Sequence, residues 1–329
     1  MKTVMFFLIL CLFLTLFTGC AGAPPTAIIM PTATNPPPAS LPTATRLAPT
    51  LTLSPQPPTL APTATPPPFP MFFTGTVQVG PYKLSMTCMG KGQPTIILEN
   101  GLDSVSWEND ALDQFYTISR TCRYLRVGMA GETISGPRTT MDQVKDLHAL
   151  LTGNSVPGPY ILVGHSIAGF NMIVYTDQYP NEVVGLVCVE CRYPSVDQIF
   201  MTKLGPPGPN DSAVIIKTRA GENKTEDDWT QYNEHLDMRS SDQQVLKVTS
   251  LGDRPFVVLV AETRGDPWGD PKMDQLFDES WMEASGILSK LSTKGKIEQV
   301  PSTDHWSILS SDMIYPAIQE VFTAVHPGK

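Results

Sequence analysis

The stretch Tyr160–Tyr175, YILVGHSIAGFNMIVY, places a serine where it could act as a nucleophile. Its first four residues are an unbroken apolar run of strand length, and from Ile167 the apolar residues recur at helical spacing. Ser166 stands at the turn between them, with small residues, Gly164 and Ala168, two positions before and after it. A serine on such a turn has an exposed hydroxyl and lies beside the unpaired N–H groups of a helix N-terminus. The pattern predicts a nucleophile elbow, and with it acyl-transfer chemistry.

Alanine at position 168 departs from the glycine that usually stands two residues after the nucleophile. Its methyl group is small and Gly169 follows at once, so we interpret the turn as intact. The alternative is a glycine-rich connection from strand to helix in which Ser166 has no chemical role. We favour the catalytic interpretation, because a strand, a turn and a helix surround the serine in the order that this chemistry needs.

A serine hydroxyl is a poor nucleophile at neutral pH and needs an adjacent base. Five histidines occur, at positions 148, 165, 235, 305 and 326. His165 adjoins Ser166, and we expect its side chain to point away from the nucleophile. Two carboxylates could orient a base: Glu190 ends the strand after the elbow, and Asp266 follows a later strand.

The elements that must position these residues alternate between strand and helix. Strands are expected at 72–80, 82–89, 95–99, 121–127, 160–163, 182–189, 255–261 and 296–300, and helices at 107–119, 139–151, 167 onward, 273–291 and 312–325. This alternation predicts an α/β fold with a mostly parallel sheet and helices on both faces. Residues 194–253 interrupt the pattern: they are polar and rich in proline, with an amphipathic helix expected near 229–238. An insertion of this length between core strands is typical of a lid.

The two ends of the chain differ in charge. The chain has 329 residues with 23 basic and 32 acidic side chains, and residues 1–70 contain two of the basic residues and no acid. Residues 71–329 therefore carry 21 basic residues against 32 acids, a net charge of −11. An acidic surface argues against nucleic acid as a partner. These residues are enough for one large domain.

Residues 1–20 form a targeting segment and not part of the fold. Lys2 precedes a continuous apolar run, and small residues then lead to Cys20. This arrangement resembles a bacterial lipoprotein signal, which implies a lipid anchor on Cys20 and an extracytoplasmic, membrane-anchored protein. The alternatives are an ordinary signal peptide and an uncleaved anchor. Residues 21–70 hold 16 of the 32 prolines and should be an extended, disordered spacer between the anchor and the domain 71–329.

From Tyr82 to Val325 the chain resembles the α/β-hydrolase fold superfamily, and most closely its bacterial serine esterase-like members. The resemblance is carried, in order, by Glu99-Asn100-Gly101-Leu102, by the helix around 146–151, by 159–169 and by the late His305. It implies a serine hydrolase that cleaves a carboxylic ester or related small acyl substrate through an acyl-enzyme, without a metal or organic cofactor. Two alternatives stay open: another acyl hydrolase, such as an aminopeptidase or lactonase, and a non-catalytic binding protein of the same fold.

The resemblance also implies roles for individual residues. His305 follows the last short strand, where this fold places its base, and the backbone N–H groups of Leu102 and Ile167 would form the oxyanion hole. Members of the superfamily place the acid at either of the two positions named above. We favour Glu190 over Asp266, because Glu190 ends an apolar strand where an unpaired carboxylate would be costly.

The domain 71–329 contains four cysteines, at positions 88, 122, 188 and 191. Cys88 and Cys122 fall on strands that are neighbours in this fold, which makes a disulfide between them possible. Cys188 and Cys191 lie on opposite faces of an extended strand and are expected to be buried thiols. After the strand 121–127 the related proteins commonly carry an Asp-Arg pair, whereas this chain has Leu125-Arg126.

Overall fold

The computed structural model describes residues 69–107, 113–221, 229–265, 268–310 and 312–326. The expected signal at 1–20, its Cys20, the spacer up to residue 68 and Asp266 lie outside the described residues. Within the described ranges, no helix is both long enough and apolar enough to cross a membrane.

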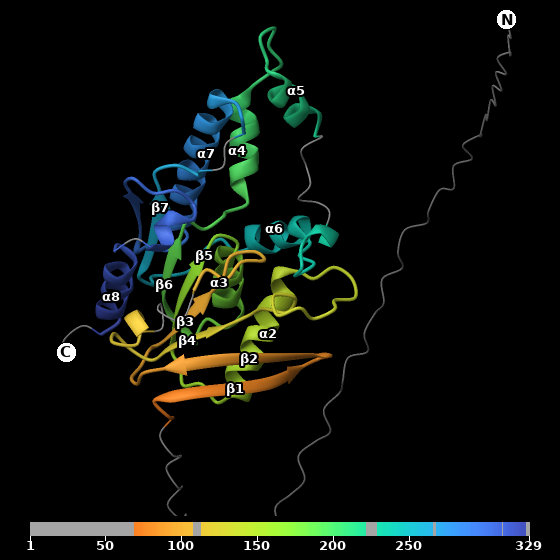
Figure 1. Ribbon diagram of the computed structural model, residues 1–329. Coiled ribbons are helices and arrows are strands. Elements are labelled where there is room, and N and C mark those ends of the chain that lie inside the picture. The colour runs from red at the N-terminus through yellow and green to blue at the C-terminus, as the bar shows by residue number, and fades with distance from the viewer. Residues whose placement is uncertain (1–68, 108–112, 222–228, 266–267, 311, 327–329) are drawn as a thin grey trace, which may run out of the picture. The chain divides into compact units, whose positions relative to one another are not determined.

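Eight strands of the described chain form one sheet, in the order β1-β2-β4-β3-β5-β6-β7-β8 (Figure 1). Strand β2 is antiparallel to β1 and β4, and every pair from β4 to β8 is parallel. The predicted mostly parallel sheet is therefore confirmed. The strands are β1 (Phe72–Val79), β2 (Tyr82–Met89), β3 (Thr95–Glu99), β4 (Thr121–Tyr124), β5 (Tyr160–His165), β6 (Val183–Val189), β7 (Phe256–Ala261) and β8 (Gly295–Val300).

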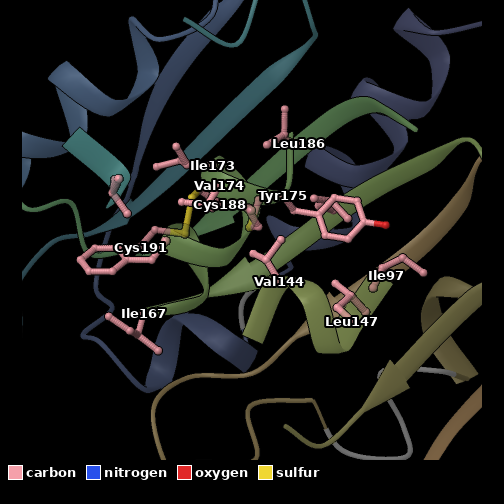
Figure 2. Packing of buried hydrophobic residues seen from close by; sticks show 14 of the residues in the cluster. Ile97, Val144, Leu147, Ile167, Ile173, Val174, Tyr175, Leu186, Cys188 and Cys191 are labelled. Atoms are coloured by element: carbon pink, nitrogen blue, oxygen red, sulfur yellow. A yellow bond between two sulfur atoms is a disulfide. The ribbon is translucent and has the colours of Figure 1, made fainter. Parts of the chain in front are cut away.

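Helices cover both faces of the sheet. The helices α2 (Thr140–Gly153), α3 (Ala168–Gln178) and α7 (Pro271–Ser289) pack on one face, and α8 (Ile314–Ala324) packs on the other (Figure 1). Successive residues of a strand serve opposite faces. In β5, Leu162 joins the cluster under α2 and α3, whereas Ile161 and Val163 join the cluster under α8. Figure 2 shows side chains of the first cluster. Because both faces are covered, every residue of β5 is buried.

The insertion between β6 and β7 contains α4 (Ser195–Leu204), α5 (Ala213–Ala220), the short 3₁₀ helix η1 (Trp229–Gln231) and α6 (Met238–Leu246). The helix expected near 229–238 is wrong in its position, because α6 begins only at Met238. Leu236 pairs with Arg138 in an extended bridge. The Asp237 carboxylate then accepts a hydrogen bond from the Ser240 N–H at 2.9 Å, which caps α6 at this point.

In the part of the chain that the structure describes, two disulfides connect buried cysteines. Cys88 and Cys122 lie directly opposite each other on β2 and β4 and are joined. Cys188 and Cys191 are also joined, so the expectation of buried thiols is wrong (Figure 2). The reason is that the strand does not continue: β6 ends at Val189, and Glu190 has a φ of +51°. The chain turns there, and the Cα atoms of the two cysteines come to lie 5.6 Å apart.

Candidate active site

The parallel strands bring their carboxyl ends to a single edge of the sheet, where open α/β sheets bind their ligands. The residues that follow β3, β5, β6, β7 and β8 at this edge include Asn100, Ser166, Glu190, Arg264 and His305, respectively. The sheet therefore gathers side chains that are up to 205 positions apart in the sequence.

Ser166 is half-buried and has a φ of +58°, a left-handed conformation that non-glycine residues rarely adopt. The turn is held from both sides, because the Ser166 N–H donates to the Val189 carbonyl at 3.2 Å and the Arg192 N–H donates to the Ser166 carbonyl at 3.0 Å. A Cβ atom on Gly164 would lie 2.8 Å from the Cβ of Ala168. The backbone at position 164 can therefore approach Ala168 this closely only because residue 164 is glycine. With glycine there, the turn accommodates alanine at position 168.

Arg126 holds the backbone of the loop after β3 in place. Arg126 donates to the carbonyl oxygens of Asn100 at 2.7 Å and Gly101 at 2.8 Å. In a trans peptide the N–H points opposite to the carbonyl, so fixing the Gly101 carbonyl also fixes the direction of the Leu102 N–H. Within the described part of the chain, neither the Leu102 N–H nor the Ile167 N–H has a protein acceptor. Both donors are therefore available to a ligand.

Arg126 itself is 2% exposed and lies between two buried carboxylates. Its Nε lies 2.6 Å from Oε2 of Glu234 in the insertion, and its Nη1 lies 3.3 Å from Oε2 of Glu99 at the end of β3. Burial alone would lower the pKa of Arg126, but the charge and hydrogen bonding of Glu234 together with the charge of Glu99 outweigh burial and raise it. This ionic cluster ties the insertion to the loop that carries Leu102. The only indication of this cluster in the sequence was Arg126, which stands where the related proteins have an Asp-Arg pair.

His305 is 4% exposed and lies against other aromatic rings, with its centroid 4.5 Å from that of His165 and 5.0 Å from that of Trp306. Its Nδ1 accepts a hydrogen bond from Nη1 of Arg264. Burial, followed by the charge of Arg264, lowers the pKa of His305 well below its usual range. Among the described residues, no hydrogen bond joins the His305 ring to Ser166 or to Glu190.

Glu190 is 1% exposed and points its carboxylate into the same region. Its Oε2 accepts a hydrogen bond from the Ala261 N–H at 2.7 Å, and its Oε1 lies 3.5 Å from Nη1 of Arg264. Burial raises the pKa of Glu190 to about 7, and the charge of Arg264 only partly opposes this rise. The same Arg264 nitrogen therefore contacts both Glu190 and His305.

Arg264 was not foreseen from the sequence, although it stands two residues before the candidate acid Asp266. Its guanidinium lies over the Trp281 ring, 3.9 Å from the centroid. Space is open around it: a cavity of about 680 Å³ is lined by Arg264, Glu190 and Trp281 among others, and a second of about 310 Å³ is lined by Arg264, Trp268 and Phe277 among others.

Two of the other histidines are engaged away from this edge. His148 on α2 stacks on Tyr179 at 3.8 Å between centroids and lies 3.1 Å from Glu182. The Nδ1 of His326 lies 3.0 Å from the carbonyl oxygen of Phe322. Within the described ranges, no three His, Cys, Asp or Glu side chains are arranged so that they could hold a metal ion.

Comparisons of the sequence with known proteins match only a part of the chain. No protein-family model matches the chain. The Hormonema carpetanum protein named "Probable transporter efuK" and an uncharacterized protein of Schizosaccharomyces pombe are each 31% identical to it, over 129 and 117 residues and 35% of its length. The chain spans only about a fifth of the length of these curated relatives, 18% and 22% respectively.

Solved structures cover far more of the chain. The lipase candidate lip1 of Acinetobacter baumannii has a TM-score of 0.52 at 15% identity, covering 79% of this chain and 93% of its own. Mouse alpha/beta hydrolase domain-containing protein 10 has a TM-score of 0.52 at 14% identity, covering 77% and 99%. The chain has the α/β-hydrolase fold. A Chitinophaga pinensis protein of the same fold has a TM-score of 0.50 at 12% identity, covering 76% and 96%.

In this α/β-hydrolase fold, the elbow, the loop after β3 and the loop after β8 occupy one edge of the sheet. The arrangement can expose a serine hydroxyl, supply two backbone N–H donors and bring a histidine and a buried carboxylate close by. Asp266, the alternative acid, lies outside the described residues.

Proposed function

We propose that this protein is a serine hydrolase that cleaves a carboxylic ester or a related acyl compound through an acyl-enzyme on Ser166. The observation that carries the proposal is the conformation of Ser166: a half-buried serine at a φ of +58° between a buried strand and a helix. Such strain persists where the surrounding structure enforces it, and it clusters at active sites. The N–H groups of Leu102 and Ile167, which have no acceptor among the described residues, support the same chemistry.

The proposed reaction has two halves. The Ser166 oxygen bonds to the acyl carbon while His305 Nε2 takes the hydroxyl proton, and the carbonyl π electrons move to the oxygen. The N–H groups of Leu102 and Ile167 stabilise this negative charge. The C–O bond to the leaving group then breaks, and the leaving group takes the proton from His305. Water repeats the sequence on the acyl-enzyme and releases the acid.

Base catalysis by His305 requires a particular tautomer. Nε2 can accept a proton only if the ring proton is on Nδ1, where it must be donated to an acceptor. Arg264 is a donor only, so its contact with Nδ1 corresponds to the other tautomer. The active arrangement therefore needs Arg264 to withdraw from Nδ1 and a carboxylate to take its place. Glu190, which already contacts the same Arg264 nitrogen, is our proposed acid.

The proposed setting is extracytoplasmic. A bacterial lipoprotein signal at 1–20 would anchor the mature chain by a lipid on Cys20, and the proline-rich residues 21–70 would hold the domain away from the membrane. A spacer of this composition extends at most ~3.1 Å per residue.

The test is labelling with a fluorophosphonate, which reacts with an activated serine. We expect the wild-type protein to be labelled and the Ser166→Ala variant not to be, with Ser135→Ala as a control that keeps labelling. Hydrolysis of p-nitrophenyl esters should follow the same pattern, and a panel of acyl chain lengths, amides and lactones then ranks the substrates. A folded wild-type protein that is neither labelled nor active would indicate a non-catalytic binding protein and would overturn the proposal.

A further inference from the structure

The buried histidine next to the nucleophile takes no part in the mechanism above. His165 is 0% exposed, although it ends β5 at the edge where the site lies. Both nitrogens of its ring have partners. Nδ1 lies 2.9 Å from the Ser106 hydroxyl oxygen, and Nε2 lies 2.9 Å from the carbonyl oxygen of His305.

Chemistry settles the direction of each hydrogen bond. A carbonyl oxygen can only accept, so His165 Nε2 must carry the proton that bonds to His305. In the neutral ring Nδ1 is then an acceptor, and the Ser106 hydroxyl must be its donor. The Ser106 oxygen in turn accepts a hydrogen bond from the Gly101 N–H at 2.8 Å. The result is one continuous series of hydrogen bonds that runs from the Gly101 N–H through Ser106 and His165 to the His305 carbonyl.

The environment keeps this ring neutral. The pKa of His165 is lowered to about 4, mainly by burial; the hydrogen bond to the His305 carbonyl opposes this effect and the charge of Arg264 adds to it. The ring is also packed on two sides, with its centroid 4.5 Å from that of His305 and 5.5 Å from that of Trp306. The packing near Gly101 is just as close, because a Cβ atom there would lie 3.0 Å from His165 Nδ1.

The two ends of this series of hydrogen bonds lie at the oxyanion loop and at the proposed base, which must cooperate in acyl transfer. Gly101 immediately precedes Leu102, whose N–H is a proposed oxyanion donor, and the other end is the backbone of the proposed base. Reacting groups must be held within a fraction of an ångström for efficient catalysis. We propose that His165 is a positioning residue that sets the oxyanion loop and the His305 loop at their working distance. This inference rests on the proposed function for its kinetic consequence, but not for its geometry.

The geometric part is tested by NMR of the full-length protein with ¹⁵N-labelled histidine, with His165 assigned from the His165→Gln variant. We expect His165 to keep its proton on Nε2, without titration, from about pH 5.5 to 8. Removing the hydroxyl in Ser106→Ala should shift the His165 ring signals and the His305 backbone amide. The matched control is Ser104→Ala in the same loop, since the Ser104 hydroxyl is buried without a partner in the described structure.

The kinetic part compares variants on a p-nitrophenyl ester. Loss of one hydrogen bond in this series should lower kcat about tenfold in Ser106→Ala, with KM within about twofold. Ser106→Thr keeps a hydroxyl and should restore most of kcat, and Ser104→Ala should behave as wild type. His165→Phe, which removes both bonds, should lose more than Ser106→Ala.

The two readouts separate the possible failures. A His165 ring that titrates near pH 6.5, or one that ignores Ser106→Ala, overturns the positioning role even if the enzyme is active. An active enzyme in which Ser106→Ala and Ser104→Ala have the same kcat also overturns it. If the wild-type protein shows no hydrolysis, the proposed function fails, while the NMR result still decides whether His165 connects the two loops.

Discussion

The guanidinium Nη1 of Arg264 donates to the imidazole Nδ1 of His305, the nitrogen that a catalytic histidine turns towards a carboxylate. The same Arg264 Nη1 lies 3.5 Å from Oε1 of Glu190. Arg264 thus stands between the proposed acid and the proposed base. The cavities of about 680 Å³ and 310 Å³ that it lines offer room for the side chain to move away.

The first prediction concerns Arg264. Truncation in Arg264→Ala removes the donor from His305 Nδ1 and lets Glu190 act there as the acceptor. A hydrogen bond to a charged group contributes roughly 1.5–3 kcal/mol, so kcat/KM for a p-nitrophenyl ester should rise about tenfold or more. Arg264→Lys, which keeps a cation, should show no such rise. A loss of activity in Arg264→Ala would show instead that the guanidinium is needed for turnover.

The second prediction identifies the acid. Replacing a triad carboxylate by its amide typically costs ~10⁴-fold in turnover, whereas a solvated loop carboxylate contributes little. Glu190→Gln should therefore lose several orders of magnitude in kcat, and Asp266→Asn should stay close to wild type. The two variants are compared by kcat and by fluorophosphonate labelling rate. The reverse order would move the acid to the loop after β7.

The third prediction follows from the pKa of Glu190, which burial raises from 4.5 to about 7. The Glu190 carboxyl group therefore binds its proton more tightly in the folded state than in the unfolded state. The contribution of this proton binding to the free energy of unfolding is fully present below about pH 4.5. It is lost as the pH rises through about 7, by roughly 3 kcal/mol. The free energy of unfolding is measured by urea denaturation for wild type and for Glu190→Gln across this pH range. The difference between the two proteins cancels the contributions of the other titrating groups. Glu190→Gln should become the more stable protein above pH 7, and parallel stability curves would contradict the buried, proton-binding carboxyl.

The fourth prediction concerns Glu234, which is 0% exposed and binds Arg126 through both oxygens, at 2.6 and 2.8 Å. Glu234→Gln leaves Arg126 with one carboxylate, and breaking a buried ion pair costs about 3–5 kcal/mol of unfolding free energy. Glu279→Gln is the control, because Glu279 lies at the surface 3.8 Å from Lys203 and such pairs are worth about 0–1 kcal/mol. Equal denaturation midpoints for the two variants would mean that the cluster does not hold the insertion in place.

The fifth prediction concerns the anchor. If Cys20 carries the lipid, Cys20→Ala should move the protein from the membrane fraction to the soluble fraction or leave it unprocessed. Mass spectrometry of the wild-type mature chain should find a lipid on Cys20 at its N-terminus. A mature chain without lipid would exclude the lipoprotein signal.

Local patterns in the sequence determined the elements and the elbow. A strand buried on both faces is an apolar run, a packed helix repeats its apolar residues, and a tight turn between them needs small neighbours. These properties depend on residues close together in the chain, so Tyr160–Tyr175 could be interpreted on its own. The resemblance to the α/β-hydrolase fold, and not a local pattern, implied that Leu102, Ser166 and His305 would act together.

Only the tertiary structure decided the contacts between those loops. Arg264 reaches His305 across 41 positions, Arg126 reaches Glu234 across 108, and His165 reaches His305 across 140. No periodicity records such pairs, because each depends on how separate loops approach and on which buried charges and hydrogen-bonding groups must find partners. The disulfide between Cys188 and Cys191 joins residues only three positions apart, but it too could not be predicted from the sequence pattern. It depends on the single left-handed residue Glu190, which ends the strand and which an extended pattern does not reveal.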